Sequence, residues 1–353
     1  MTLEAWGWGP EWEERRAGQP WAAASVARVS GQDRGQWTVQ TADGPRIARA
    51  AVSTTLDPYP TVGDWVAWEA GPTAPDPLSL VAVLPRRSTF SRASAGDGRT
   101  EQALATNIDD VWVLHGLDVP LNPRRLERYL TLAWASGGQP AVVLTKADLT
   151  ADPEAARRDA EGVALGVPVR LVSAQDHVSM ASLRETLAPG RTVVLLGPSG
   201  VGKSTLLNAL AGAELAQTGA VREGDRKGRH TTTRRQLFQL EGGALVIDTP
   251  GLRELRVWTL DEGLELAFPD IDELAGSCRF SDCRHDREPG CAVLEALTAG
   301  TLAEERLASF RKLQAEALHE GRKSDHRARK AAVSEHKTAL KTLAHHPKRL
   351  GGA

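Results

Sequence analysis

The chain has 353 residues, of which 25% are charged and 41% hydrophobic, the composition of an ordinary soluble protein with two or three domains. No apolar run approaches the about 20 residues that a membrane span requires, so we expect no membrane partner. The first six residues lack the basic and apolar regions of a signal peptide, which favours a cytoplasmic location. The formal net charge of −2 hides a strongly basic stretch at residues 306–349.

The N-terminal part of the chain predicts a small β-barrel. Residues 1–20 are rich in Trp, Gly and Glu without a clear period, so we expect a partly ordered lead-in. Short β-type runs follow, separated by turn residues, at 25–29, 36–40, 46–50, 64–68 and 80–84. Short strands at this spacing within residues 21–85 fit a barrel of the OB type, a fold that often binds single-stranded nucleic acid.

The tryptophans of this barrel have two interpretations. Trp37, Trp65 and Trp68 could stack on nucleic-acid bases, or they could fill the barrel interior. Buried aromatic side chains dominate core energetics, so we favour the interior.

Residues 86–258 alternate strands with helices. Residues 86–98 are basic and rich in Gly and Ser, which predicts a linker or flexible loop. Apolar runs predict buried strands at 108–114, 140–148, 167–172, 192–196 and 244–247, with helical patterns at 124–136, 153–165 and 179–187 between the first four. This alternation predicts an α/β domain with a parallel sheet and helices on both faces.

A phosphate-binding loop follows the fourth of these strands. Residues 197–204 fit G-x-x-x-x-G-K-[ST], with a buried strand before them and a helix-prone run at 205–211 after them. Backbone N–H groups of such a loop form a nest for phosphate oxygens at the positive end of a helix. Lys203 can reach the β- and γ-phosphates, and the Ser204 hydroxyl can hold Mg²⁺. The expected nucleotide contacts are Gly197, Pro198, Ser199, Gly200, Val201, Gly202, Lys203, Ser204 and Thr205.

Two further motifs predict guanine recognition. Residues 145–148 read Thr-Lys-Ala-Asp, similar to the Asn-Lys-x-Asp of GTPases, and residues 173–174 resemble the last GTPase element. Asp148 can accept two hydrogen bonds from guanine that adenine cannot offer. Thr145 stands where Asn is usual, so we expect a weaker hydrogen bond at that edge of the pocket. The expected base contacts are Thr145, Lys146, Ala147, Asp148, Ser173 and Ala174.

A last pair of motifs predicts the γ-phosphate and magnesium contacts. Asp248 ends an apolar strand, where P-loop proteins place an acid that holds Mg²⁺. Gly251 lets its backbone N–H approach a γ-phosphate. The expected magnesium ligands are Ser204 and Asp248, with Thr232 or Thr233 from the segment Gly-Arg-His-Thr-Thr-Thr at 228–233.

The order of these motifs is unusual. An ordinary small GTPase begins with its phosphate loop and ends with its guanine motifs, whereas here Asp148 and Ser173 precede Lys203, and Asp248 comes last. Folds with neighbouring termini tolerate relocated ends, so the sequence predicts a circularly permuted domain whose motifs meet at one edge of the sheet. Whatever follows the γ-phosphate segments is then tethered to them.

The chain's three cysteines lie close together. Cys278, Cys283, His285 and Cys291 form C-x₄-C-x-H-x₅-C, and three thiolates with one imidazole match a closed, structural zinc site. This spacing does not suit a disulfide framework and indicates a reducing compartment. The alternative is inert apolar cysteines with a solvated His285. Predicted helices at 260–274, 293–299 and 302–318 flank the cluster.

The chain beyond residue 321 is basic with few acids. Beside a zinc module and an OB-like barrel, this tail predicts an RNA-facing surface held by phosphate contacts. The predicted parts are a lead-in (1–20), the barrel (21–85), a circularly permuted GTPase domain (86–258), a helical zinc domain (259–320) and the basic tail (321–353).

With these residues assembled, the chain resembles the RsgA (YjeQ) family of circularly permuted GTPases. The most specific parts of the resemblance are residues 197–205, 228–233, 248–251 and 278–285. The resemblance implies a factor that binds the nearly finished small ribosomal subunit and its rRNA, hydrolyses GTP when stimulated by it, and then leaves. It also suggests His230 as a catalytic residue, because Leu252 stands where many GTPases have a water-orienting Gln.

Two other functions fit parts of the sequence. One is a P-loop ATPase or kinase, and the other is an RNA-binding assembly protein that only senses GTP. Our prediction is a monomeric GTP hydrolase with Lys203 and His230 as catalytic residues. Its expected ligands are GTP or GDP, Mg²⁺ and one Zn²⁺ per chain, and its expected partner is the small subunit.

Overall fold

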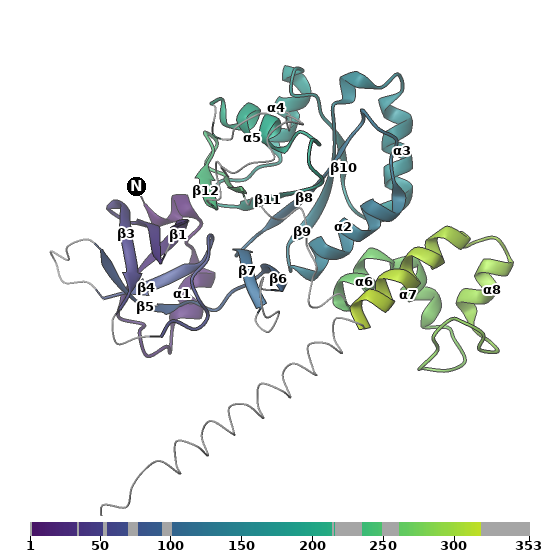
Figure 1. Ribbon diagram of the computed structural model, residues 1–353, viewed down its shortest axis with the longest axis horizontal. Helices are drawn as coiled ribbons and strands as arrows, with labels where there is room; N and C mark the ends of the chain where they lie inside the picture. The colour runs from purple at the N-terminus through teal and green to yellow at the C-terminus, as the bar shows by residue number, and fades with distance from the viewer. Residues whose placement is uncertain are drawn as a thin grey trace, which may run out of the picture.

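The computed structural model describes residues 2–33, 35–51, 55–69, 77–93, 101–213, 215, 235–248 and 261–318. These residues form a β-barrel, an α/β part built on a mainly parallel sheet, and a helical C-terminal part (Figure 1). The predicted multidomain architecture is confirmed, while the domain boundaries stay predictions. Within the described residues, the helices lack the combination of length and apolar character that crossing a bilayer demands.

The barrel contains the strands that the sequence predicted. They are β1 (Ser25–Asp33), β2 (Gln36–Thr41), β3 (Gly44–Ala50), β4 (Trp65–Trp68) and β5 (Leu78–Val83). Their order is β1-β2-β3-β5-β4, and β4 pairs back onto β1, so the sheet closes. Trp37 and Trp65 are 2% and 0% exposed and Trp68 is half-buried, so the interior interpretation holds for the first two.

Two segments are more ordered than expected. Residues 3–6 and 10–16 form a 3₁₀ helix, η1 (Leu3–Trp6), and a helix, α1 (Pro10–Arg16), which bury Trp6 and Trp12. The rings of Trp8 and Trp12 lie 4.7 and 6.0 Å from that of Trp65, which explains why a segment without a clear period is held in place.

The predicted linker at 86–98 is also wrong in part. Its residues 89–93 form β6 (Thr89–Ala93), which pairs antiparallel with β7 (Glu101–Thr106). Phe90 is 1% exposed, so this strand contributes to the core despite its polar neighbours.

The central sheet continues from the barrel and positions the predicted motifs. β12 (Gln236–Gln239) pairs with β1 at Gly31 on one side and antiparallel with β13 (Leu245–Asp248) on the other. Beyond β13 the strands are parallel, in the order β13, β11 (Thr192–Leu196), β8 (Asp110–Gly116), β9 (Gln139–Thr145) and β10 (Val169–Leu171). The strand that leads into the phosphate loop, β11, therefore lies between β13 and β8, although β8, β9 and β10 all precede it in the chain.

Helices cover both faces of this sheet, as predicted. Alternate strand residues point to opposite faces. Val113 and Leu144 pack in one apolar cluster with α2 (Pro123–Ala135) and α3 (Pro153–Val163). Trp112 and Val143 pack in another with α4 (His177–Glu185) and α5 (Lys203–Ala211).

The C-terminal part packs on α2. It contains α6 (Asp261–Ala267), α7 (Pro269–Ala275), α8 (Ala292–Thr298) and further helical residues at 304–318. The predicted helix at 260–274 is broken at Phe268, because Pro269 starts a new helix and cannot donate a backbone hydrogen bond. A Cβ at Gly263 would lie 2.4 Å from the Thr131 carbonyl oxygen, so α6 and α2 approach closely there.

Candidate functional site

The phosphate loop has the backbone that its glycines predict. It joins β11 to α5, and Gly200 and Gly202 adopt φ values of 79° and 100°, which favour glycine. A Cβ at Gly197 would lie 2.8 Å from the Leu114 carbonyl oxygen, so the loop passes too close to β8 for a side chain. The Lys203 ammonium folds over the loop and donates to the carbonyls of Gly197 and Pro198 at 2.7 and 2.6 Å.

The first guanine motif lies against this loop. Thr145 ends β9, and its hydroxyl donates to the Val201 carbonyl at 2.7 Å. Lys146 donates from Nζ to the Gly200 carbonyl at 2.9 Å. Two segments more than 50 positions apart in the chain therefore touch at the carboxyl edge of the sheet. The short Thr145 side chain thus reaches the phosphate loop, while the expected weakening at this edge of the guanine pocket stays a prediction.

The second guanine motif is held beside the first. The N–H of Ala147 donates to the Val172 carbonyl at 3.2 Å, so the turn that carries Asp148 is joined to the end of β10. Asp148 is exposed at this edge. Ser173 is 5% exposed and Ala174 is exposed, directly after Val172.

The loop that carries Ser173 is hydrogen-bonded to the first turn of α4. Asp176 accepts hydrogen bonds from the N–H groups of Val178 and Ser179 at 3.1 and 3.0 Å. The backbone N–H and hydroxyl of Ser179 lower the pKa of Asp176, followed by the N–H of Val178. The Ser179 hydroxyl also lies 3.3 Å from the Ser173 carbonyl. This contact joins the first turn of α4 to the second guanine motif.

Of the predicted magnesium ligands, the structure describes Ser204 and Asp248. Ser204 lies in the first turn of α5, and Asp248 ends β13, the strand next to β11; both are half-buried. A hydroxyl in the helical turn that follows the phosphate loop and a carboxylate at the end of the neighbouring strand are oxygen donors of the kind Mg²⁺ takes, so the donor set fits. His230, Thr232, Thr233 and Gly251 lie outside the described residues.

One residue at this edge of the sheet belongs to no sequence motif and was not predicted. Asp118 follows β8, and its Oδ2 accepts from Lys146 Nζ at 2.6 Å. The sequence did contain an indication of this role: Asp118 comes just after a buried parallel strand, and the residues at that position lie on the edge of the sheet where ligands bind. Its link to Lys146, 28 positions later, leaves no local pattern.

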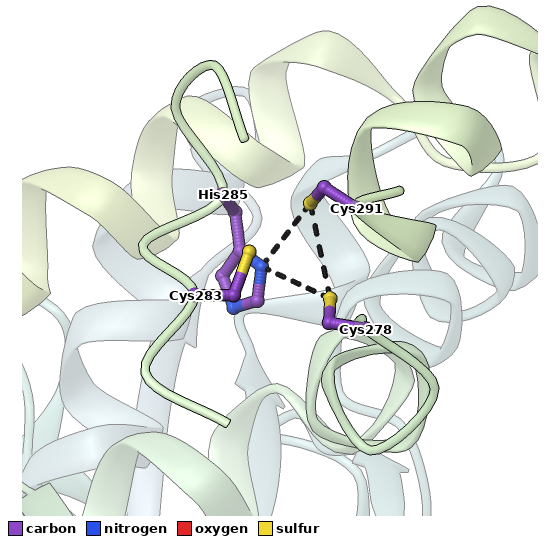
Figure 2. Close-up of side chains that lie close together, drawn as sticks. All are labelled: Cys278, Cys283, His285 and Cys291. Carbon is purple, nitrogen blue, oxygen red and sulfur yellow. Dashed lines mark hydrogen bonds between the residues drawn. The ribbon is translucent and has the colours of Figure 1, made fainter. Parts of the chain in front are cut away.

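Four potential metal ligands come together in the cysteine cluster, and three of them lie at the separations of a tetrahedral metal site (Figure 2). A tetrahedral zinc ion with Zn–S bonds of about 2.3 Å and a Zn–N bond of about 2.0 Å requires S···S separations of about 3.8 Å and S···N separations of about 3.5 Å. Cys278 Sγ lies 3.8 Å from Cys291 Sγ and 3.6 Å from His285 Nδ1, which is 3.4 Å from Cys291 Sγ. All four ligand atoms, including Cys283 Sγ, lie within 4.8 Å of one another. The cluster is therefore compatible with zinc, and the solvated His285 of the alternative interpretation is wrong because this side chain is 6% exposed.

The loop between these ligands is fixed by backbone contacts. His285 has φ 57°, a left-handed conformation that a non-glycine residue keeps only where its surroundings enforce it. Its carbonyl accepts from the Arg311 guanidinium. Glu288 accepts from the N–H groups of Arg284, Asp286 and Arg287 at 2.8–3.1 Å. The N–H of Asp286 contributes most, followed by the N–H of Glu288 itself, and together with the other bonds they lower the pKa of Glu288 to about 2.

Known proteins share this organisation. Residues 83–258 match the family model described as RsgA GTPase. The chain is 46% identical over 343 residues to the small ribosomal subunit biogenesis GTPase RsgA of Streptomyces coelicolor, covering 95% of this chain and 92% of that protein. It is 44% identical to the protein of the same name from Opitutus terrae, covering 92% of each chain.

Solved structures agree. The crystal structure of YjeQ from Thermotoga maritima superposes with a TM-score of 0.63 at 26% identity, covering 83% of this chain and 98% of that one. YloQ, described as a circularly permuted GTPase, shares the fold with a TM-score of 0.61 at 24% identity. Sequence and fold thus point the same way as the permuted motif order, and the chain belongs to the RsgA GTPase family.

Proposed function

We propose that this chain hydrolyses GTP to GDP and phosphate during late maturation of the small ribosomal subunit, and that the subunit stimulates the reaction. The hydrogen bond from the Thr145 hydroxyl to the Val201 carbonyl carries this proposal. It brings the base-reading motif onto the phosphate loop although the chain order of the two is reversed. The names of the relatives from Streptomyces coelicolor and Opitutus terrae support the biological context.

In this proposal the described residues divide the substrate between them. The Asp148 carboxylate accepts from the guanine N1–H and amine, and a backbone N–H near Ala174 donates to the guanine O6. The backbone N–H groups within residues 197–205, Pro198 having none, hold the phosphates. Lys203 leaves the carbonyls it now contacts and neutralises the charge that develops as water attacks the γ-phosphate in line.

Two metal ions complete the proposal. Ser204 and Asp248, with Thr232 or Thr233, would hold Mg²⁺, which supplies charge neutralisation for the phosphates. Cys278, Cys283, His285 and Cys291 would hold one structural Zn²⁺ with no open position, so this site shapes the C-terminal part and takes no part in hydrolysis.

In this proposal the attacking water is positioned by the predicted γ-phosphate segments, residues 228–233 and the residues that follow Asp248. Leu252 follows Gly251 and is apolar, so it cannot orient water. His230 is the proposed replacement, on sequence grounds alone. If the subunit places His230 against the water, turnover is slow without the subunit and rises when it binds.

We further propose that the protein acts as a monomer in the cytoplasm and contacts rRNA. The barrel and the basic residues beyond 321 supply the phosphate contacts. The stacking role considered for Trp37 and Trp65 is withdrawn, because both side chains are buried.

Phosphate release tests the proposal. GTP and ATP hydrolysis are measured with and without purified small subunits, at low and high salt. We expect GTP to be strongly preferred, subunits to raise the rate, and salt to weaken the stimulation steeply. Equal binding of ATP would refute the role of Asp148 and favour an ATPase. Subunit binding without faster phosphate release would favour a GTP sensor.

A further inference from the structure

A salt bridge stands beside the guanine motif. Lys146 Nζ donates to Asp118 Oδ2 at 2.6 Å and to the Gly200 carbonyl at 2.9 Å. Asp118 belongs to the connection between β8 and α2, Lys146 follows β9, and Gly200 belongs to the phosphate loop. One ammonium group therefore joins three connections at the carboxyl edge of the sheet.

The backbone at the end of β8 makes room for this arrangement. A Cβ at Gly116 would lie 2.5 Å from Asp118 Oδ1 and 3.6 Å from Lys146 Cδ, so any side chain there would displace the carboxylate. The N–H of Leu117 donates to the Thr145 carbonyl at 2.9 Å and ties the same connection to the guanine motif. The missing side chain at Gly116 and the hydrogen bond from Leu117 to Thr145 thus bring Asp118 and Lys146 close together.

The conformation of Lys146 is itself constrained. Its backbone is left-handed, with φ 57° and ψ 38°, which a non-glycine residue keeps where contacts enforce it. The salt bridge and the bond to Gly200 are such contacts. The hydrogen bond from Lys146 lowers the pKa of the Asp118 carboxyl, so this group remains ionised at neutral pH.

We infer that Asp118 is a positioning residue for guanine-nucleotide recognition, whose carboxylate holds Lys146 against the phosphate loop. The lysine stem then forms one wall of the base site before the nucleotide arrives. This inference rests on the proposed function, because it takes the ligand to be a guanine nucleotide. A lysine side chain carries considerable rotamer entropy, and ordering it in advance removes that cost from binding. Asp118 acts through Lys146 and not on the transferred phosphate, so it tunes affinity and leaves the chemical step alone.

The test uses the full-length protein and fluorescent analogues of GDP and GTP. We expect Asp118→Ala to weaken the binding of both by about three- to tenfold. The KM for GTP in subunit-stimulated hydrolysis rises by the same factor, while kcat stays unchanged. Asp118→Glu, which keeps the carboxylate, recovers most of the affinity. Asp110→Ala is the matched control, because Asp110 starts β8 at the opposite edge of the sheet and pairs with Arg191 at 2.7 Å; it leaves affinity unchanged.

A double-mutant cycle separates positioning from a merely structural role. In a Lys146→Ala background, Asp118→Ala has no further effect if the carboxylate acts through the lysine. An equal loss in both backgrounds, or wild-type affinity in Asp118→Ala, overturns the inference and leaves the proposed function intact. The proposed function fails by a different result, namely wild-type protein that binds an ATP analogue as tightly as a GTP analogue.

Discussion

The hydroxyl of Thr145 donates a hydrogen bond to the carbonyl of Val201 across 2.7 Å, and both residues are buried. This bond joins the end of β9 to the phosphate loop from a position where related motifs carry Asn. The Val201 carbonyl lies close enough to β9 for a short side chain to reach it. A threonine at position 145 is therefore sufficient to form this link.

Removing this hydroxyl is expected to loosen the loop. Thr145→Val keeps the shape but leaves the Val201 carbonyl without this donor, which costs about 1–2 kcal/mol of unfolding free energy. We expect GTP and GDP to bind about tenfold more weakly. Thr145→Ser keeps the hydroxyl and serves as the control. Urea unfolding and fluorescent-nucleotide titration measure the two effects, and a Thr145→Val protein with wild-type affinity would show that the bond is incidental.

The cysteine cluster predicts one tightly held zinc ion per chain. Cys283→Ser is expected to lose the metal and to destabilise the C-terminal part by about 3–5 kcal/mol, because a lost metal site is among the costliest changes. Ser281→Ala, an exposed residue in the same loop, is the control. Metal analysis and thermal unfolding measure the outcome. Full stability in the presence of a strong chelator, with no bound metal, would contradict the assignment.

The cap of α4 predicts a pH dependence. Because the pKa of Asp176 is lowered in the folded protein, its contribution to stability is complete above its ordinary value of 3.8 and is lost as the pH falls through the lower, folded value. Asp176→Ala is therefore expected to reduce the melting temperature at pH 7 and to converge on the wild type below pH 3.8.

Asp176→Asn separates the charge from the cap. Asparagine still accepts from the Ser179 N–H but does not ionise, so this variant keeps much of the stability and loses the pH dependence. Asp159→Ala, an exposed carboxylate on α3, is the control. A constant difference between wild type and Asp176→Ala from pH 7 to pH 3 would contradict the assignment of this carboxylate.

Local patterns were enough to predict the barrel and central strands and most helices, but not β6 and β7, and they located those sheet-edge motifs that fall on described residues. The alternation in residues 36–40, for example, gave the strand β2, and Trp37 within it proved buried. The phosphate loop needed only its glycines and the flanking strand and helix. These features are encoded within a few neighbouring positions, so a single sequence reveals them.

Long-range polar contacts were not predictable in this way. Arg28, in the barrel, is 2% exposed and donates to the Thr192 hydroxyl at 2.7 Å, 164 positions away. Burial lowers its pKa to about 10. Nothing near Arg28 in the sequence marks it as a core residue, because its acceptors, the Trp6 and Asn107 carbonyls and the Thr192 hydroxyl, all come from distant parts of the chain. The order of residues 3–16 was missed for the same reason.

Arg306 is the second such residue, and it joins the C-terminal part to the sheet-covering helices. It donates to Glu127 on α2 at 2.9 Å and to Asp270 on α7 at 2.7 Å, and its guanidinium lies 4.4 Å from the centre of the Phe268 ring. The side chains of Arg306 and Glu127 are 10% and 3% exposed. A charge buried this deeply depends on its partner, since removing one member of a buried pair leaves the other uncompensated.

Arg306→Met is therefore expected to lower the free energy of unfolding by about 3–5 kcal/mol. Adding Glu127→Met should recover much of this loss, because an apolar pair of similar volume then fills the site. Arg157→Ala is the control: its pairs with Glu154 and Glu161 on the surface of α3 are more exposed, so it should cost less than about 1 kcal/mol. Urea unfolding of the wild type, Arg306→Met, Glu127→Met and the double variant measures the coupling, with Arg157→Ala measured beside them. If the losses from Arg306→Met and Glu127→Met simply add, the two charges do not stabilise one another, and other contacts, such as the Arg128–Glu316 ion pair and the close packing of α6, hold the C-terminal part on α2.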